Sequence, residues 1–171
     1  MTLIKGLHHA AYRCRNSEET RRFYEDFLGL PLVDALEINT TASGRDANVL
    51  HTFFAMDDGS CIAFFEEPDA PFEFVDQRDF DLHIALSVDM ETLHDMLDRG
   101  KREGLEPRGI SDHGFIHSIY FRDPNGYVVE LTAPIETQSK TSPEDRGHRA
   151  RETLERWASR SGQVSEAAKE L

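Results

Sequence analysis

Hydrophobic and polar positions along this chain form a pattern that occurs twice. In the first half, the apolar run Leu7–Cys14 predicts a strand. A helix is predicted next, opened by Ser17 as its N-cap and ended by Gly29, because apolar positions recur at a spacing of three and four residues. These positions are Thr20, Phe23, Tyr24, Phe27 and Leu28. Three further strands are predicted at Leu30–Glu37, Val49–Met56 and Ser60–Glu66.

The second half repeats this order. Leu82–Val88 predicts a strand, and Asp89–Gly104 has the apolar spacing of a helix. The strands that follow are expected at Pro107–Ser111, His117–Phe121 and Tyr127–Thr132. The two first strands lie about 74 residues apart, from His9 to His83. The pattern therefore predicts an α+β fold in which two tandem βαβββ modules form a cupped mixed β-sheet.

Composition marks the boundaries between these parts. The polar segment Asn39–Asp46 reads as a loop, and the proline- and acid-rich segment Pro68–Asp79 reads as a linker. We expect one domain at residues 1–136, with module one at about 5–67 and module two at about 80–135, followed by a linker and helix at 137–171. Thr137–Lys140 is the polar part of that linker, and Ser142 with Pro143 predicts the start of the helix. This helix could pack on its own core, pack on a partner subunit or cover the mouth of an active site.

The alternation of side chains along the strands selects one of two neighbouring histidines. In the second module, Ile84, Leu86 and Val88 share the face expected to pack on the helix, so His83, Ala85 and Ser87 share the other face. Alignment of the two modules places His9 at the position of His83. The small residues beside both histidines leave room for a ligand.

The most unusual polar residue is Glu130, which lies among apolar residues in the last predicted strand. The turn before this strand, Asp123-Pro124-Asn125-Gly126, has the residues that a hairpin prefers. A buried carboxylate is costly unless it is paired with a cation or bound to a metal. Two histidines and one carboxylate have the composition of the facial triad that binds Fe(II), and these residue types also suit Mn(II), Ni(II) or Zn(II).

Charge and composition exclude several classes of partner. The net charge of −13 argues against a nucleic-acid partner, which requires clustered Lys and Arg. No run of 18 apolar residues predicts a membrane span, and the N-terminal sequence lacks the form of a signal peptide. The two cysteines, Cys14 and Cys61, lie in apolar runs and fit a reducing environment. We therefore expect a cytoplasmic protein.

The chain resembles the vicinal oxygen chelate superfamily, which includes glyoxalase I, bleomycin and fosfomycin resistance proteins and type I extradiol dioxygenases. The resemblance covers roughly residues 5–135. Its motifs are LHHAAY, RRFYEDFLGLPL, LHIALSV and SIYFRDPNGYVVELT. It implies that His9, His83 and Glu130 are metal ligands. Extradiol dioxygenases also have a tyrosine and a histidine near the last hairpin, and these are matched here by Tyr120 and His113.

Comparison of the two modules assigns further positions. Ala63, four residues after Gly59, matches Glu130, four residues after Gly126, and cannot supply the second carboxylate of glyoxalase-type sites. Glu66 lies further along the strand and is a weak substitute. Phe54 is assigned to the position of Tyr120 and is expected to form an aromatic wall. His51 and His117 are interpreted as equivalent residues on the strand side opposite to Tyr120.

These observations favour a metal-dependent enzyme, specifically an extradiol-type ring-cleaving dioxygenase that acts on a small catecholic or hydroquinone-like substrate and O2. Fe(II) is the preferred metal, His113 the expected acid or base, and Tyr120 the expected hydrogen-bond donor. Two alternatives remain: a metal-dependent isomerase or lyase of the glyoxalase type, and a resistance protein that transfers a thiol or binds a drug. A homodimer is expected because superfamily members form the cupped sheet either within one chain or across a dimer.

Overall fold

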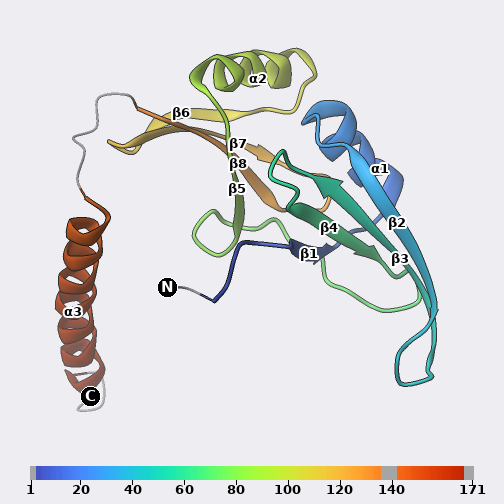
Figure 1. Cartoon of the computed structure of the whole chain (residues 1–171), viewed down its shortest axis with the longest axis horizontal. Helices are drawn as coiled ribbons and strands as arrows, with labels where there is room; N and C mark the ends of the chain where they lie inside the picture. Colours follow the sequence, from blue (N-terminus) through green and yellow to red (C-terminus); the bar gives the residue numbers. More distant parts are fainter. Residues whose placement is uncertain (1–2, 136–141, 168–171) are drawn as a thin grey trace. The chain divides into compact units, whose positions relative to one another are not determined.

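The computed structural model of the chain describes residues 3–135 and 142–167, and the chain divides into two units (Figure 1). Unit 1, Met1–Ile135, contains two modules, each with the predicted order of one strand, one helix and three strands. Unit 2, Glu136–Leu171, contains the helix α3 (Pro143–Ala167). The predicted linker Thr137–Lys140 lies outside the described residues. The α+β class and the tandem βαβββ modules are confirmed.

The first module forms a four-stranded mixed sheet. Its elements are β1 (His9–Arg13), α1 (Ser17–Arg21) with its π-helical continuation η1 (Arg22–Phe27), β2 (Leu32–Thr40), β3 (Asp46–Ala55) and β4 (Cys61–Glu66). The strand order is β1-β4-β3-β2, with β1 parallel to β4 and the other neighbours antiparallel. The edge strands are therefore β1 and β2.

The second module repeats this topology. Its elements are β5 (His83–Ser87), α2 (Met90–Arg102), β6 (Arg108–Asp112), β7 (Ile116–Arg122) and β8 (Val128–Pro134). The strand order is β5-β8-β7-β6, and β5 is parallel to β8. Figure 1 shows α2 lying across the strands β6, β7 and β8. One face of this sheet is thus covered by a helix.

The predicted side-chain alternation in β5 is confirmed. Ile84 and Leu86 are buried in the core, whereas His83, Ala85 and Ser87 are exposed on the opposite face. The core is continuous between the modules, because residues from both sheets, from η1 and from α2 belong to one buried cluster. The side chains of Phe27 and Phe121, for example, meet edge to face across the module boundary, with ring centroids 5.1 Å apart.

The turn between β7 and β8 forms hydrogen bonds with residues of the first module. Asp123 accepts a hydrogen bond from the buried hydroxyl of Tyr24, at 3.1 Å. Asn125, which is 1% exposed, donates to Thr20 and accepts from the backbone N–H of Arg15. The residues that predicted the hairpin turn therefore also form buried hydrogen bonds between the two modules. Loss of one partner would leave a buried donor or acceptor unpaired, which costs stability.

Three local predictions were wrong. The N-cap of α1 is Asn16, whose side chain accepts from Glu19 N–H, rather than Ser17. Residues predicted as the loop Asn39–Asp46 lie partly in strands, because β2 and β3 form a longer ribbon. Phe54 is fully buried on the helix side and is not the equivalent of Tyr120. That equivalent is Phe53, which pairs with Ala63 as Tyr120 pairs with Glu130.

His51 was also misplaced by the sequence comparison. His51 precedes Phe53 by two residues and pairs with Phe65 on β4. In the second module, the residue two before Tyr120 is Ser118, which pairs with Thr132 on β8. His51 therefore corresponds to Ser118 rather than to His117. His51 therefore lies on the same side of β3 as Phe53. Ala63 itself occupies the position expected for the equivalent of Glu130.

Candidate metal centre and active site

Glu130 lies in the middle of β8 and is 6% exposed. One carboxylate oxygen is 3.2 Å from Nε2 of His83, and the other accepts a hydrogen bond from the Tyr120 hydroxyl at 3.3 Å. No Lys or Arg in the described part of the chain forms an ion pair with this carboxylate. The local sheet register explains the cluster, because Ala85 on β5 and Tyr120 on β7 flank Glu130 on either side.

His83 is oriented by its second ring nitrogen. Its Nδ1 lies 2.7 Å from the carbonyl oxygen of Asp79, four residues earlier. A proton on Nδ1 donates to that carbonyl, and the lone pair of Nε2 then faces the side of Glu130. This is the arrangement in which protein histidines bind metals. The donor chemistry of His83 and Glu130 therefore fits a divalent cation.

Tyr120 and His113 form the next part of the site. The Tyr120 hydroxyl lies 2.9 Å from Nε2 of His113. Because Tyr120 has a single hydroxyl proton, Nε2 of His113 carries a proton in the arrangement in which Tyr120 donates to Glu130. Burial and the neighbouring Glu130 carboxylate raise the pKa of Tyr120, so its hydroxyl remains protonated at neutral pH.

These side chains line a cavity of about 530 Å³. Phe80, Phe115 and Ile116 supply apolar walls, and Ser111 adds a hydroxyl. The size and the mixture of apolar walls with a few converging polar groups are typical of a site for a small molecule. The cavity therefore has room for an aromatic ring beside the polar cluster.

Arg108 and Asp79 are parts of the site that the sequence did not reveal. The two side chains form an ion pair, and the Arg108 guanidinium lies over the Tyr120 ring, 4.6 Å from its centroid. Asp79 thus forms an ion pair with Arg108 through its side-chain carboxylate and a hydrogen bond with His83 through its backbone carbonyl. The sequence signal is weak, because the pairing of Arg108 with Tyr120 depends on the register between β6 and β7.

His9 lies apart from this cluster, on the first sheet. It is exposed at the start of β1, and its Nδ1 is 2.7 Å from Nδ1 of His8. Its ring also packs against Phe53 and His51. Within residues 3–135 and 142–167, no three His, Cys, Asp or Glu side chains are grouped so that they could hold a metal ion. One chain thus brings four of the five predicted site residues together, namely His83, His113, Tyr120 and Glu130.

Comparison with known proteins assigns the family. The profile of the Glyoxalase/Bleomycin resistance protein/Dioxygenase superfamily matches residues 6–131, which is most of the chain. The chain belongs to this superfamily.

Solved structures of the superfamily share the fold. A glyoxalase/dioxygenase from Nostoc punctiforme has a TM-score of 0.59 and 23% identity, over 77% of this chain and 92% of that protein. The fosfomycin resistance protein FosX from Listeria monocytogenes, complexed with Mn(II), has a TM-score of 0.58 and 22% identity, over 78% of this chain and 96% of that one. At these identities the similarity extends to the fold alone.

A dioxygenase is similar in sequence over a shorter stretch. Biphenyl-2,3-diol 1,2-dioxygenase 2 from Rhodococcus globerulus is 44% identical over 52 residues. The match covers 29% of this chain and 26% of that enzyme, so the similarity is confined to about a quarter of the dioxygenase.

None of the described helices in this superfamily member has the length and hydropathy needed to cross a membrane.

Proposed function

We propose that this superfamily member is a metal-dependent, extradiol-type ring-cleaving dioxygenase that acts on a small catecholic or hydroquinone-like substrate with O2. The observation that carries the proposal is the continuous set of contacts from His113 through Tyr120 and Glu130 to His83, along one wall of a cavity. An isomerase could use the same metal ligands, but the paired Tyr120 and His113 supply the donor and the acid or base that ring cleavage requires. The similarity to the biphenyl-2,3-diol dioxygenase supports this choice.

His83 and Glu130 are the proposed ligands from the second module, and His9 is the proposed third ligand, for Fe(II) in preference to Mn(II), Ni(II) or Zn(II). When bound, such a metal lowers the pKa of the catechol hydroxyl and brings substrate and O2 together. Glu130 is well suited to this role because its burial penalises an unpaired carboxylate.

Side chains of the cavity then transfer protons and position the substrate ring. The Tyr120 hydroxyl can exchange its contact with Glu130 for one with a substrate oxygen, and its raised pKa keeps it a donor. In the other tautomer, Nε2 of His113 is unprotonated and accepts from the Tyr120 hydroxyl. The hydroxyl then passes its proton to Nε2 while it takes up the second phenolic proton, and the reverse transfer later returns that proton. Phe115 and Ile116 exclude water beside the ring.

We further propose that a second copy of the chain supplies His9. Within one chain His9 lies on the first sheet, away from His83 and Glu130. Both histidines are exposed at the first residue of their strands, β1 and β5, and exposed apolar residues such as Phe80 and Phe115 lie beside His83. A two-fold dimer would pair each first module with the other chain's second module and create two equivalent sites. The free thiols of Cys14 and Cys61 support a cytoplasmic location.

Anaerobic purification, metal analysis and oxygen-electrode assays with a panel of catechols test the proposal. We expect stoichiometric iron, catechol-dependent O2 uptake and a yellow ring-opened product. Stoichiometric Zn or Ni without O2 uptake would contradict the dioxygenase and favour the isomerase or lyase. Absence of bound metal with drug binding would instead favour a resistance protein. Glu130→Ala tests only the ligand set, because loss of metal is expected for every metalloenzyme of this fold.

A further inference from the structure

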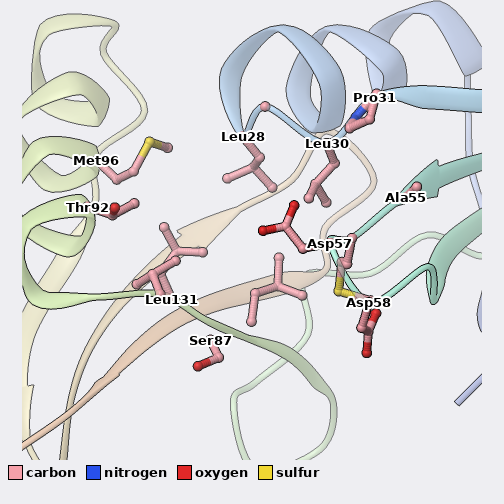
Figure 2. Close-up of a pocket in the computed structure, with 14 residues that line it drawn as sticks. Leu28, Leu30, Pro31, Ala55, Asp57, Asp58, Ser87, Thr92, Met96 and Leu131 are labelled. Atoms are coloured by element: carbon pink, nitrogen blue, oxygen red, sulfur yellow. The ribbon is translucent and has the colours of Figure 1, made fainter. Parts of the chain in front are cut away.

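A second cavity, of about 390 Å³, lies at the junction of the two modules (Figure 2). The first module contributes the segment between η1 and β2 and the turn between β3 and β4. The second module contributes the end of β5, one face of α2 and Leu131 of β8. None of its lining residues belongs to the site around Glu130.

The walls of this cavity are mainly apolar. Leu28 and Leu30 face Leu131 across it, and Met96 approaches from α2 (Figure 2). Met56 is a further lining residue. Methionine side chains adapt their shape to a ligand, so walls that contain two of them can accommodate apolar groups of different outline.

One charged group points into this apolar space. Figure 2 shows the Asp57 carboxylate directed toward Leu28 and Leu30, whereas Asp58 of the same turn points away. Asp58 accepts hydrogen bonds from the backbone N–H and the hydroxyl of Ser60, which lower its pKa. Asp57 has no side-chain hydrogen bond or ion pair to any described residue. The turn thus uses one carboxylate for its own structure and leaves the other available.

The charge of the lining residues selects the class of ligand. The cavity contains Asp57, Asp58 and the hydroxyl residues Ser87 and Thr92, and no Lys, Arg or His is among the described residues that line it. An anion would therefore meet only like charge, and a neutral ligand would gain no charge attraction from Asp57. A cationic head with an apolar body satisfies both the carboxylate and the walls.

We propose that this cavity binds a small organic cation with an apolar body, such as an alkyl- or arylammonium ion. Because Asp57 is exposed, it keeps much of its hydration, and the charge pair contributes about a fivefold gain in affinity. Each buried methylene contributes about a fourfold gain, so the apolar walls supply most of the binding. This proposal does not depend on the dioxygenase activity.

Titration of the full chain with n-hexylammonium, followed by calorimetry and by NMR of the methionine methyl groups, tests the site. We expect saturable binding of one ion per chain, with shifts of the Met56 and Met96 methyl resonances and none at Met90, which does not line the cavity. Hexanoate should bind at least tenfold more weakly. Asp57→Asn should weaken hexylammonium binding about fivefold and leave 1-hexanol binding unchanged, and Asp58→Asn serves as the matched control.

A second variant tests the position of the cation. Met96→Lys places an ammonium group on the wall of the cavity, where it should compete with the ligand and abolish the Met56 shift. Equal affinity for hexylammonium and hexanoate, insensitivity to Asp57→Asn, or shifts confined to residues outside this cavity would each overturn the proposal. These results leave the catechol assays untouched, so failure of one proposal is distinguishable from failure of the other.

Discussion

Nε2 of His113 lies 2.9 Å from the hydroxyl oxygen of Tyr120, although the two residues belong to different segments of the second module. His113 follows β6, whereas Tyr120 lies within β7. The antiparallel pairing of these strands brings both side chains to the cavity that contains Glu130. The proposed acid or base and the proposed hydroxyl donor are therefore already in contact.

Removal of the Tyr120 hydroxyl should slow the chemical step. Tyr120→Phe keeps the ring under Arg108 but removes the donor, so we expect kcat to fall about 10- to 100-fold. Metal content should stay unchanged, because Tyr120 is not a proposed ligand. Steady-state kinetics with metal analysis on the same sample checks both statements. Unchanged kcat would show that the hydroxyl has no part in the reaction.

Replacement of His113 should remove the acid or base. His113→Gln retains a hydrogen-bonding side chain but cannot take up a proton, so a loss of about 100-fold or more in kcat is expected. His117→Gln is the matched control, since His117 lies on β7 close to Asp112 and outside the cavity lining. Similar losses in both variants would argue for a general structural effect rather than for a role in proton transfer.

A shared metal site predicts complementation between inactive variants. His9→Ala and Glu130→Ala should each be inactive alone, but a mixed dimer contains one site with both His9 and Glu130. Random mixing should therefore restore about a quarter of wild-type activity. His83→Ala mixed with Glu130→Ala is the control, because both residues come from the same module and no intact site can form. Failure of the first pair to recover activity would place the whole site within one chain.

Gly126 should be far less replaceable than another glycine of the same backbone conformation. Its φ is +97°, and an added Cβ would lie 2.6 Å from the backbone carbonyl oxygen of Val75. Gly44 also has positive φ, at +80°, but a Cβ there meets no atom within 4 Å. We expect Gly44→Ala to lower the free energy of unfolding by about 1–2 kcal/mol and Gly126→Ala by clearly more. Urea unfolding of both variants measures the difference.

The first turn of α1 should contribute to stability in a pH-dependent way. Hydrogen bonds from Arg21 and Arg22 lower the pKa of Glu18 from 4.5 to about 2. Because the folded-state pKa is depressed, the contribution is present above pH 4.5 and is lost as pH falls toward 2. The difference in urea midpoint between wild type and Glu18→Gln should therefore shrink below pH 4.5. A constant difference between pH 6 and pH 3.5 would contradict the ion pairs.

Local patterns in the sequence were sufficient to predict the helices and strands and the sheet face on which most site residues lie. The alternation in β5 placed His83 opposite Ile84 and Leu86, and the structure confirms it. The same reasoning failed for Phe54 and His51, since the alignment of modules was one residue out along β3. A shift of one residue moves every side chain to the other face of a strand, so short apolar runs without a marker such as Glu130 leave the face undetermined.

The sequence by itself determined the tandem modules, the buried Glu130 and its partner His83, because these follow from periodicity and from the cost of burying a charge. Only the tertiary structure decided that His113 contacts Tyr120, that Asp79 links His83 to Arg108, and that His9 belongs to a different sheet from Glu130. Each of these relationships depends on strand register, on a linker conformation or on the packing of one module against the other. Interactions between distant residues set these features, and a one-dimensional pattern does not contain them.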